Sequence, residues 1–242
     1  MRTFACALAL TLTAGPLLAA DAPKADAKPA VDADRATYSY GYTIGKTISS
    51  LGFSESELKQ VLSGFEDGAR GHKAPFAVDK YQDQIRELIE GHLVAMAVKE
   101  KALGKAYGEK FSKHAGVKPL DGGGWYRIEK QGDGEMATPD DTVKVNYRGK
   151  LIDGTEFDSS YKRGEPATFP LKGVIPCWTN GVSKLRVGGK ATLVCPSDAA
   201  YGDHGHPPVI PGGATLIFDV ELLDIVKPDA KTAGAGAGSG GQ

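Results

Sequence analysis

A run of alternating residues near the middle of the chain constrains the fold more than any other feature. Within residues 143–151 the apolar side chains of Val143, Val145 and Tyr147 alternate with polar ones. A period of two is typical of a β-strand with one buried face. The Asp153-Gly154 pair that follows predicts a tight hairpin turn. This part of the chain is therefore expected to begin an antiparallel sheet.

Two later segments add to the predicted sheet. Residues 191–195 and 215–226 are rich in β-branched and other apolar side chains, which favours strands. Between the strands a short helix is expected to open at Trp178 and to stop near Gly188-Gly189. The C-terminal half is therefore predicted to be a small antiparallel sheet with one short helix.

The residues before this sheet have a helical pattern instead. Three helices are expected, over residues 34–51, 54–71 and 79–114, from apolar residues that recur at helical spacing. The second starts with a capping-box sequence, Ser54-x-x-Glu57. The fold class is thus α+β, with the helices preceding the sheet. These three helices carry more apolar surface than they could obviously bury against one another. They could form either a self-contained three-helix bundle or a dimerisation module whose apolar faces meet a second copy.

The two ends of the chain have special compositions. Residues 1–20 combine a basic Arg2 with an apolar run that ends in Leu-Ala-Ala, which is typical of a secretory signal peptide. A membrane anchor is the weaker alternative because the run is short for a span and contains Gly15-Pro16. Residues 21–34 are predicted to be a flexible linker, and the Gly/Ala-rich residues 229–242 a disordered tail. We therefore expect an exported protein without stable membrane insertion.

The overall charge argues against one class of function. The 242 residues include 29 Lys and Arg against 30 Asp and Glu, without a basic run. Proteins that bind nucleic acid usually show a basic patch or stripe, so no nucleic-acid partner is expected.

Several sequence motifs of the C-terminal half occur together in a fixed order. They are YRGKLIDGTEFDSS (147–160), VIPCW (174–178), AYGDHGHP (200–207) and TLIFDVEL (215–222). These motifs resemble those of the FKBP-type peptidyl-prolyl cis-trans isomerases, the receptors of tacrolimus, over roughly residues 124–228. A signal peptide, YSYGYTIGK (38–46) and a long helix before such a domain resemble the macrophage-infectivity-potentiator branch, whose members dimerise through their N-terminal helices.

This resemblance implies a domain organisation and a function. Residues 35–115 are expected to be a helical dimerisation domain with a linking helix, and residues 116–228 an FKBP-type domain whose antiparallel sheet wraps on a short helix. The implied activity is rotation of X-Pro bonds in unfolded or partly folded exported proteins, together with folding-chaperone activity. The implied compartment is the periplasm, with outer-membrane association or secretion open. The alternatives are a peptide-binding chaperone with a vestigial isomerase site and a surface-interaction protein.

Carried over motif by motif, the resemblance also implies site residues. The catalytic residues are expected to be Asp158, Tyr201 and Phe218. The substrate-binding residues are expected to be Tyr147, Phe157, Val174, Ile175, Trp178, His206 and Ile210. Arg163 matches an arginine that orients the carboxylate. Ala167 stands where many members have an aromatic, which opens one wall of the pocket and is expected to weaken the binding of tacrolimus-like inhibitors. Taken singly, each aromatic could simply be a core residue.

No cofactor or metal is expected. Rotation about an amide bond needs neither a nucleophile nor a metal ion, and the chain has no obvious catalytic triad. The His204-x-His206 pair in a Gly-rich loop is only a weak signal for a metal site.

A disulfide between Cys177 and Cys195 is expected. Of the three cysteines, Cys6 lies in the predicted signal peptide, so an exported chain keeps two. The resembling fold packs the strand that ends at Cys195 beneath the helix that carries Cys177. The alternative is a pair of buried thiols that act as small apolar side chains.

Overall fold

The computed structural model of the chain describes residues 31–227. The predicted signal peptide, most of the predicted linker and the predicted tail lie outside the described residues. By its contacts the chain divides into two units, Met1–Tyr40 and Gly41–Gln242.

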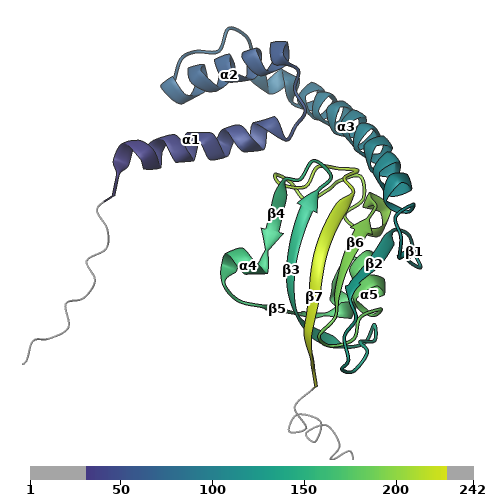
Figure 1. The fold of residues 1–242 in the computed structure, drawn as a ribbon. Coiled ribbons are helices and arrows are strands. Elements are labelled where there is room, and N and C mark those ends of the chain that lie inside the picture. The colour runs from purple at the N-terminus through teal and green to yellow at the C-terminus, as the bar shows by residue number, and fades with distance from the viewer. Residues whose placement is uncertain (1–30, 228–242) are drawn as a thin grey trace, which may run out of the picture. The chain divides into compact units, whose positions relative to one another are not determined.

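Three α-helices form the first part of the described chain (Figure 1). They are α1 (Ala33–Ser49), α2 (Glu55–Arg70) and α3 (Gln82–Phe111), with a 3-10 turn, η1 (Val78–Tyr81), before the last of them. The three predicted helical segments are therefore present. The predicted start of the third is corrected, because residues 78–81 form the tighter 3-10 turn rather than α-helix. Along residues 31–227, no helix is both long enough and apolar enough to cross a lipid bilayer.

The ends of α2 follow directly from its sequence. The backbone N–H of Ser54 donates to Glu57 Oε2 (2.8 Å), and the backbone N–H of Glu57 donates to Ser54 Oγ (3.4 Å), so the predicted capping box is formed. Gly71 ends the helix in a left-handed conformation, with φ of 71°. Glycine adopts this conformation at little cost because it has no Cβ.

An antiparallel sheet of seven strands makes up most of the second part. The strands are β1 (Val117–Pro119), β2 (Trp125–Lys130), β3 (Thr142–Leu151), β4 (Glu156–Ser159), β5 (Ala167–Pro170), β6 (Lys190–Cys195) and β7 (Leu216–Val226). Their order is β1-β2-β6-β7-β3-β4, and β5 also pairs with β3. The central pair, β3 with β7, runs in register along all ten residues of β3, with one irregularity after Lys144.

The alternation that predicted β3 is confirmed by its burial. Val143 and Val145 are fully buried and Tyr147 is nearly so, whereas Lys144 and Arg148 face solvent. The predicted hairpin turn is also present, because the Leu151 N–H donates to the Thr155 carbonyl (2.9 Å). The buried face of the sheet therefore defines one side of the hydrophobic core.

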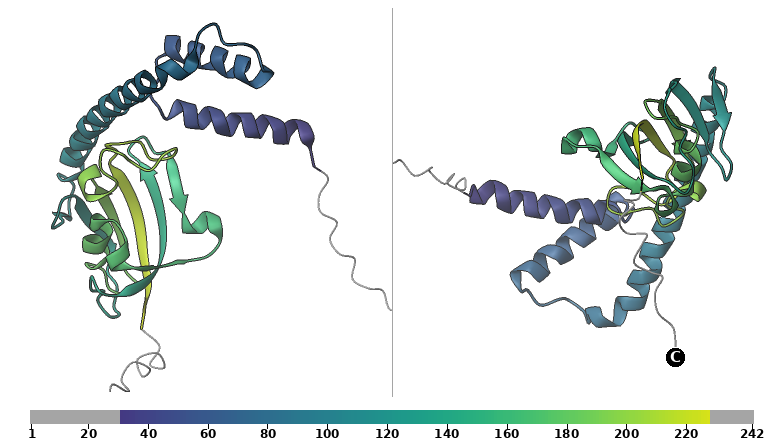
Figure 2. Two further views of the ribbon diagram at one scale, coloured as in Figure 1. Left: turned by 180° about the vertical axis from the view of Figure 1, so that it is seen from behind. Right: turned by 90° about the horizontal axis from the view of Figure 1, so that it is seen from below.

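Short helical segments lie in the connections between strands. They are α4 (Ser160–Arg163), η2 (Leu171–Gly173), α5 (Pro176–Val182) and η3 (Ser197–Ala199). α5 lies against the buried face of the sheet, and Trp178 and Val182 join the core cluster (Figures 1 and 2). The helix opens at Pro176 rather than at Trp178, because proline fits the first helical position, where its missing N–H is not needed. It ends at Val182, six residues before the predicted glycines.

The sequence pattern shows neither β1 nor β5. β1 lies close to the glycines of residues 122–124, and its three residues pair with β2 at the edge of the sheet. β5 pairs with the first residues of β3, Phe169 opposite Val143. Both strands are too short to show the alternation of apolar and polar residues that marks a strand.

The C-terminal half of α3 packs closely against the sheet domain. Gly104 and Gly108 are buried, and a Cβ at either position would overlap a side chain, that of Thr215 or that of Trp125 respectively. Phe111 is 6% exposed at the end of the same helix face. The absence of side chains at the two glycines therefore lets the helix backbone approach the domain.

Candidate functional site

A cavity of about 320 Å³ opens beside the central strands. Its walls come from five separate stretches of the chain, and one of the ten lining residues is a glycine. The lining residues are Tyr147, Phe157, Asp158, Phe169, Gly173, Val174, Ile175, Trp178, Tyr201 and Phe218. Six of them are aromatic and one is a carboxylate, so the cavity suits an apolar group with few polar atoms beside it.

Trp178 forms the centre of the aromatic wall. Its ring centroid lies 5.2 Å from that of Tyr147 and 5.2 Å from that of Phe218, with interplanar angles of 90° and 84°. Phe169 makes a third edge-on contact at 5.7 Å. Such edge-to-face contacts add to the stability gained by burying the rings. The indole is therefore fixed in orientation by three neighbours.

The carboxylate of Asp158 is held by three donors. It accepts hydrogen bonds from the Tyr147 hydroxyl, from the Arg163 guanidinium and from the Ser159 backbone N–H (2.8 Å). Arg163 Nη2 also donates to the Tyr147 hydroxyl (2.8 Å), and its guanidinium lies 5.3 Å from the ring centroid of Tyr147. Arg163 thus lies against Asp158, as the sequence predicts. The charge-assisted bonds fix the carboxylate in one orientation at the cavity wall.

Tyr201 lies across the cavity in the loop that follows η3. Its side chain is partly exposed, and its ring contacts that of His206 edge-on at 5.6 Å. Among residues 31–227, no hydrogen bond engages its hydroxyl. The hydroxyl is therefore available to donate to a bound molecule.

Two tyrosine hydroxyls in the cavity resist ionisation. Burial raises the pKa of Tyr147 above its ordinary value of 10.0, and the hydrogen bond to Asp158 raises it further, although the bond to Arg163 opposes this. Burial also raises the pKa of Tyr201, with a further contribution from the negative charge of Asp158. Both hydroxyls thus remain protonated donors throughout the physiological pH range.

These shifts predict how stability depends on pH. The folded chain keeps protons that the unfolded chain releases from about pH 10, so the free energy of unfolding should fall above pH 10 and be unaffected by these groups below it. In the double variant Tyr147→Phe, Tyr201→Phe this fall should be shallower. Denaturant unfolding between pH 7 and 11 measures both curves. Equal slopes above pH 10 would contradict the assignment.

Most of the residues predicted from the sequence meet in this cavity. Eight of the ten line it, and two do not. His206 is exposed, and its ring contacts that of Tyr201 edge-on. Ile210 is only 4% exposed and belongs to the core cluster, where it is joined to His206 by a β-bridge. Its side chain therefore does not line the cavity, and its predicted contact with substrate stays a prediction.

Sequence reasoning left two lining residues, Phe169 and Gly173, out of the site. Phe169 lies on β5, which places its ring edge-on to Trp178 but is too short to be predicted. Gly173 ends the 3-10 turn before Val174 and lines the cavity through its backbone and hydrogens.

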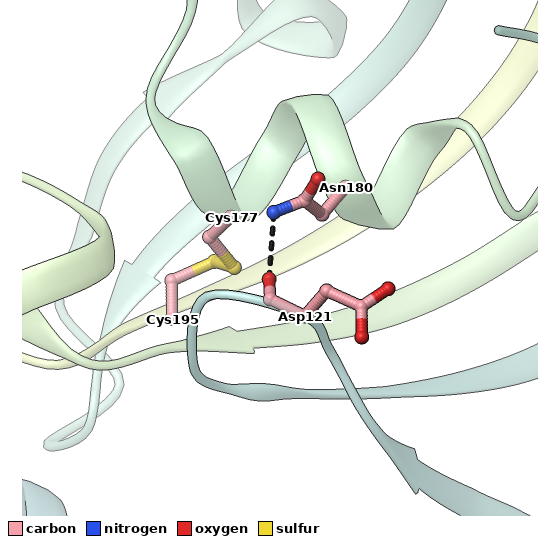
Figure 3. Close-up of a disulfide and its surroundings, with 4 residues drawn as sticks. All are labelled: Asp121, Cys177, Asn180 and Cys195. Carbon is pink, nitrogen blue, oxygen red and sulfur yellow. Dashed lines mark hydrogen bonds between the residues drawn. A yellow bond between two sulfur atoms is a disulfide. The ribbon is translucent and has the colours of Figure 1, made fainter. Parts of the chain in front are cut away.

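The predicted disulfide joins Cys177 to Cys195, with the two Cα atoms 5.6 Å apart (Figure 3). It links α5 to the end of β6, directly beside Trp178. Asn180, one turn further along α5, donates from Nδ2 to the Asp121 carbonyl (2.6 Å). The helix that carries Trp178 is therefore tied both to β6 and to the loop before β2.

The described residues hold no group of three or more His, Cys, Asp or Glu side chains placed to bind a metal ion. The polar groups of the cavity are one carboxylate and the hydroxyls of two tyrosines, with Arg163 behind them.

Comparison with known proteins agrees with this architecture. Residues 133–223 match the model of the FKBP-type peptidyl-prolyl cis-trans isomerase, and residues 33–128 match the model of the domain amino terminal to it. The chain is 38% identical to the FKBP-type peptidyl-prolyl cis-trans isomerase FkpA of Escherichia coli strain K12. The matched region covers 95% of this chain and 89% of that protein. It is 41% identical to FkpA of Aeromonas hydrophila, over 87% of this chain and 82% of that protein.

A solved structure shows the same fold. The crystal structure of FkpA from Escherichia coli matches with a TM-score of 0.62 and 37% identity, over 81% of this chain and 97% of that one. Sequence and structure agree over both the helical part and the sheet domain. The chain belongs to the FKBP-type peptidyl-prolyl cis-trans isomerases.

Proposed function

We propose that this isomerase rotates X-Pro bonds in exported proteins in the periplasm, using the aromatic cavity around Trp178. The observation that carries the proposal is the cavity itself, which combines six aromatic rings with one oriented carboxylate. The N-terminal sequence supports export, since it is typical of a signal peptide. The clients are proline-containing unfolded or partly folded chains.

The chemistry explains why such a cavity suffices. Amide resonance opposes rotation with a barrier of about 18–20 kcal/mol, and uncatalysed X-Pro bonds take tens to hundreds of seconds to rotate. In the twisted transition state this conjugation is lost, so a site accelerates rotation when it binds the twisted form better than either planar form. A cavity lined mainly by rings excludes water and grips the proline ring.

Each polar residue has a role in this proposal. The ring of the substrate proline lies over Trp178, with Phe218 and Phe157 beside it. Tyr201 donates its hydroxyl to a substrate carbonyl and so holds one side of the rotating bond. Asp158 presents a fixed negative charge to the amide, whose carbonyl carbon becomes more electrophilic when conjugation is lost. His206 flanks the substrate outside Tyr201, and Ile210 supports the loop from the core.

The cavity is tested by turnover of a proline tetrapeptide with the full chain, with and without a tacrolimus-like inhibitor. Catalysed turnover that the inhibitor suppresses supports the proposal. Suppression of protein aggregation without any catalysed turnover would instead support a chaperone whose isomerase site is vestigial. Ala167, at the edge of the β5 wall, offers less contact to an inhibitor than an aromatic side chain would.

The helical part supports a proposal about assembly. We infer a homodimer formed through the N-terminal helices, which also add chaperone capacity. α1 and α2 contain no buried residue, and large apolar side chains on α2 and α3 are about half exposed, namely Leu62, Phe65, Ile85 and Leu88. A second copy would cover such faces, since isolated monomers seldom leave so many large apolar groups in water.

Deleting residues 21–96 should give a monomer that turns over short peptides at nearly the wild-type rate but assists unfolded proteins poorly. The cut is placed before Ala97 because residues 97–111 pack on the sheet domain. Light scattering measures the mass, and refolding of a proline-limited protein measures assistance. A monomer mass for the intact mature protein would contradict the dimer.

A further inference from the structure

Lys101 on α3 bridges two carboxylates that stand on either side of Tyr201. Its Nζ lies 3.1 Å from Asp198 Oδ1 and 2.5 Å from Asp203 Oδ1. Asp198 precedes Tyr201 by three residues and Asp203 follows it by two. The stretch of chain that carries the tyrosine into the cavity is therefore tied at both ends to the Lys101 ammonium group on α3.

The backbone of the same loop is also held against α3. A Cβ at Gly213 would overlap the backbone of Ala97, so the two segments are in close contact. Within the loop, the Gly213 N–H donates to the Gly202 carbonyl (2.9 Å), and the Gly202 N–H donates to the Ser197 carbonyl (2.8 Å). The helix thus contacts the loop beyond Tyr201 as well as through the two carboxylates.

The charge of the lysine stabilises this arrangement, although the Asp198 and Asp203 side chains are 81% and 62% exposed. Both carboxylates approach the same nitrogen, so without it two negative charges would face each other across a short gap. The amine stays protonated, because hydrogen bonds to Asp203 and then to Asp198 raise the pKa of Lys101 above its usual range. Removing the cation should therefore release residues 198 and 203 from the helix and loosen the position of Tyr201, which lies between them in the chain.

We propose that Lys101 is a positioning residue for the isomerase reaction: from outside the cavity it holds the loop of Tyr201 so that the hydroxyl meets the substrate carbonyl. The inference rests on the role proposed above for Tyr201. It gives α3 a part in catalysis, since α3 then sets the position of the Tyr201 hydroxyl relative to the substrate carbonyl.

The test compares Lys101→Met with the wild type in the full chain, using kcat and KM for a proline tetrapeptide. Lys101→Met keeps the aliphatic stem and removes the charge, and kcat/KM should fall about two- to fivefold, the scale of an ion pair that solvent reaches. Lys101→Arg should restore activity, because its guanidinium can still serve both carboxylates. Lys105→Met, the same exchange one turn further along the exposed side of α3, should leave kcat/KM unchanged.

A double-mutant cycle with Tyr201→Phe separates positioning from a general structural effect. If Lys101 acts through the hydroxyl, Lys101→Met should cost nothing further once that hydroxyl is absent. An equal loss in both backgrounds, or no loss from Lys101→Met alone while Tyr201→Phe is impaired, overturns this inference and leaves the role of Tyr201 standing. Full activity of Tyr201→Phe itself overturns that role and the inference with it.

Ionic strength gives an independent readout. Salt screens a solvent-accessible ion pair, so kcat/KM of the wild type should fall towards that of Lys101→Met as salt rises, whereas the variant should respond less. Parallel salt curves for the two proteins would overturn the inference.

Discussion

Replacing Asp158 by leucine should lower kcat/KM for a proline tetrapeptide by about tenfold to a hundredfold. The estimate assumes that the carboxylate stabilises the transition state by about 1.5–3 kcal/mol, the usual contribution of a hydrogen bond to a charged group. The carboxylate is the one acidic group in the cavity lining, and three donors fix its orientation. Leucine fills the same space without the charge, so the loss measures the electrostatic role rather than a cavity.

The fold should survive this substitution. The side chains of Asp158 and Arg163 are 41% and 43% exposed, so the arginine left behind can be solvated. Asp140→Leu is the matched control, because Asp140 pairs with Lys172 on the surface and is absent from the cavity. Circular dichroism checks both variants. Wild-type turnover by Asp158→Leu would remove the carboxylate from the proposed mechanism.

Reduction of the Cys177–Cys195 disulfide should destabilise the sheet domain by about 3 kcal/mol. The two cysteines are 18 residues apart, and closing a loop of this size removes about that much free energy from the unfolded chain in the loop-entropy model. For a domain of roughly 100 residues this corresponds to a fall in Tm of about 10–20 °C. The bond also holds α5, which carries Trp178, against the end of β6, so kcat/KM should fall as well.

Thermal unfolding with and without reductant measures the effect. The variant Cys177→Ala, Cys195→Ala should have a lowered Tm that no longer responds to reductant, which controls for effects of the reductant elsewhere. Mass spectrometry of the unreduced, alkylated protein shows whether the bond is present in purified material. An unchanged Tm on complete reduction would show that packing alone holds α5 in place.

How far the sequence predicted the structure depended on the length of each element. The ten residues of β3 allow the alternation of Val143, Val145 and Tyr147 to show, and the capping box of α2 is a local pattern in which all partners are three residues apart. β5 has four residues, and pairing with β3 rather than its own pattern decides its place. Phe169 was therefore missed as part of the site.

The site itself was predicted mainly through the family resemblance, and what the sequence does not show depends on tertiary contacts. Ile210 lies in a matching motif, and the loop folds so that its side chain packs in the core rather than lining the cavity. Lys101 was not singled out at all, because it lies about a hundred residues before the loop it contacts. A lysine on a charged helix looks like an ordinary solvated residue until the loop is placed beside it.

The glycines of α3 also bear on where the catalytic domain begins. Composition puts a boundary at the Gly-rich residues 116–124, after the helix has ended. Packing puts it earlier, because Gly104 and Gly108 bring the helix backbone onto Thr215 and Trp125. A fragment cut at residue 116 would expose the side chains of Thr215 and Trp125 that the helix covers. It should be less soluble than one cut before Ala97, although it keeps every residue of the cavity.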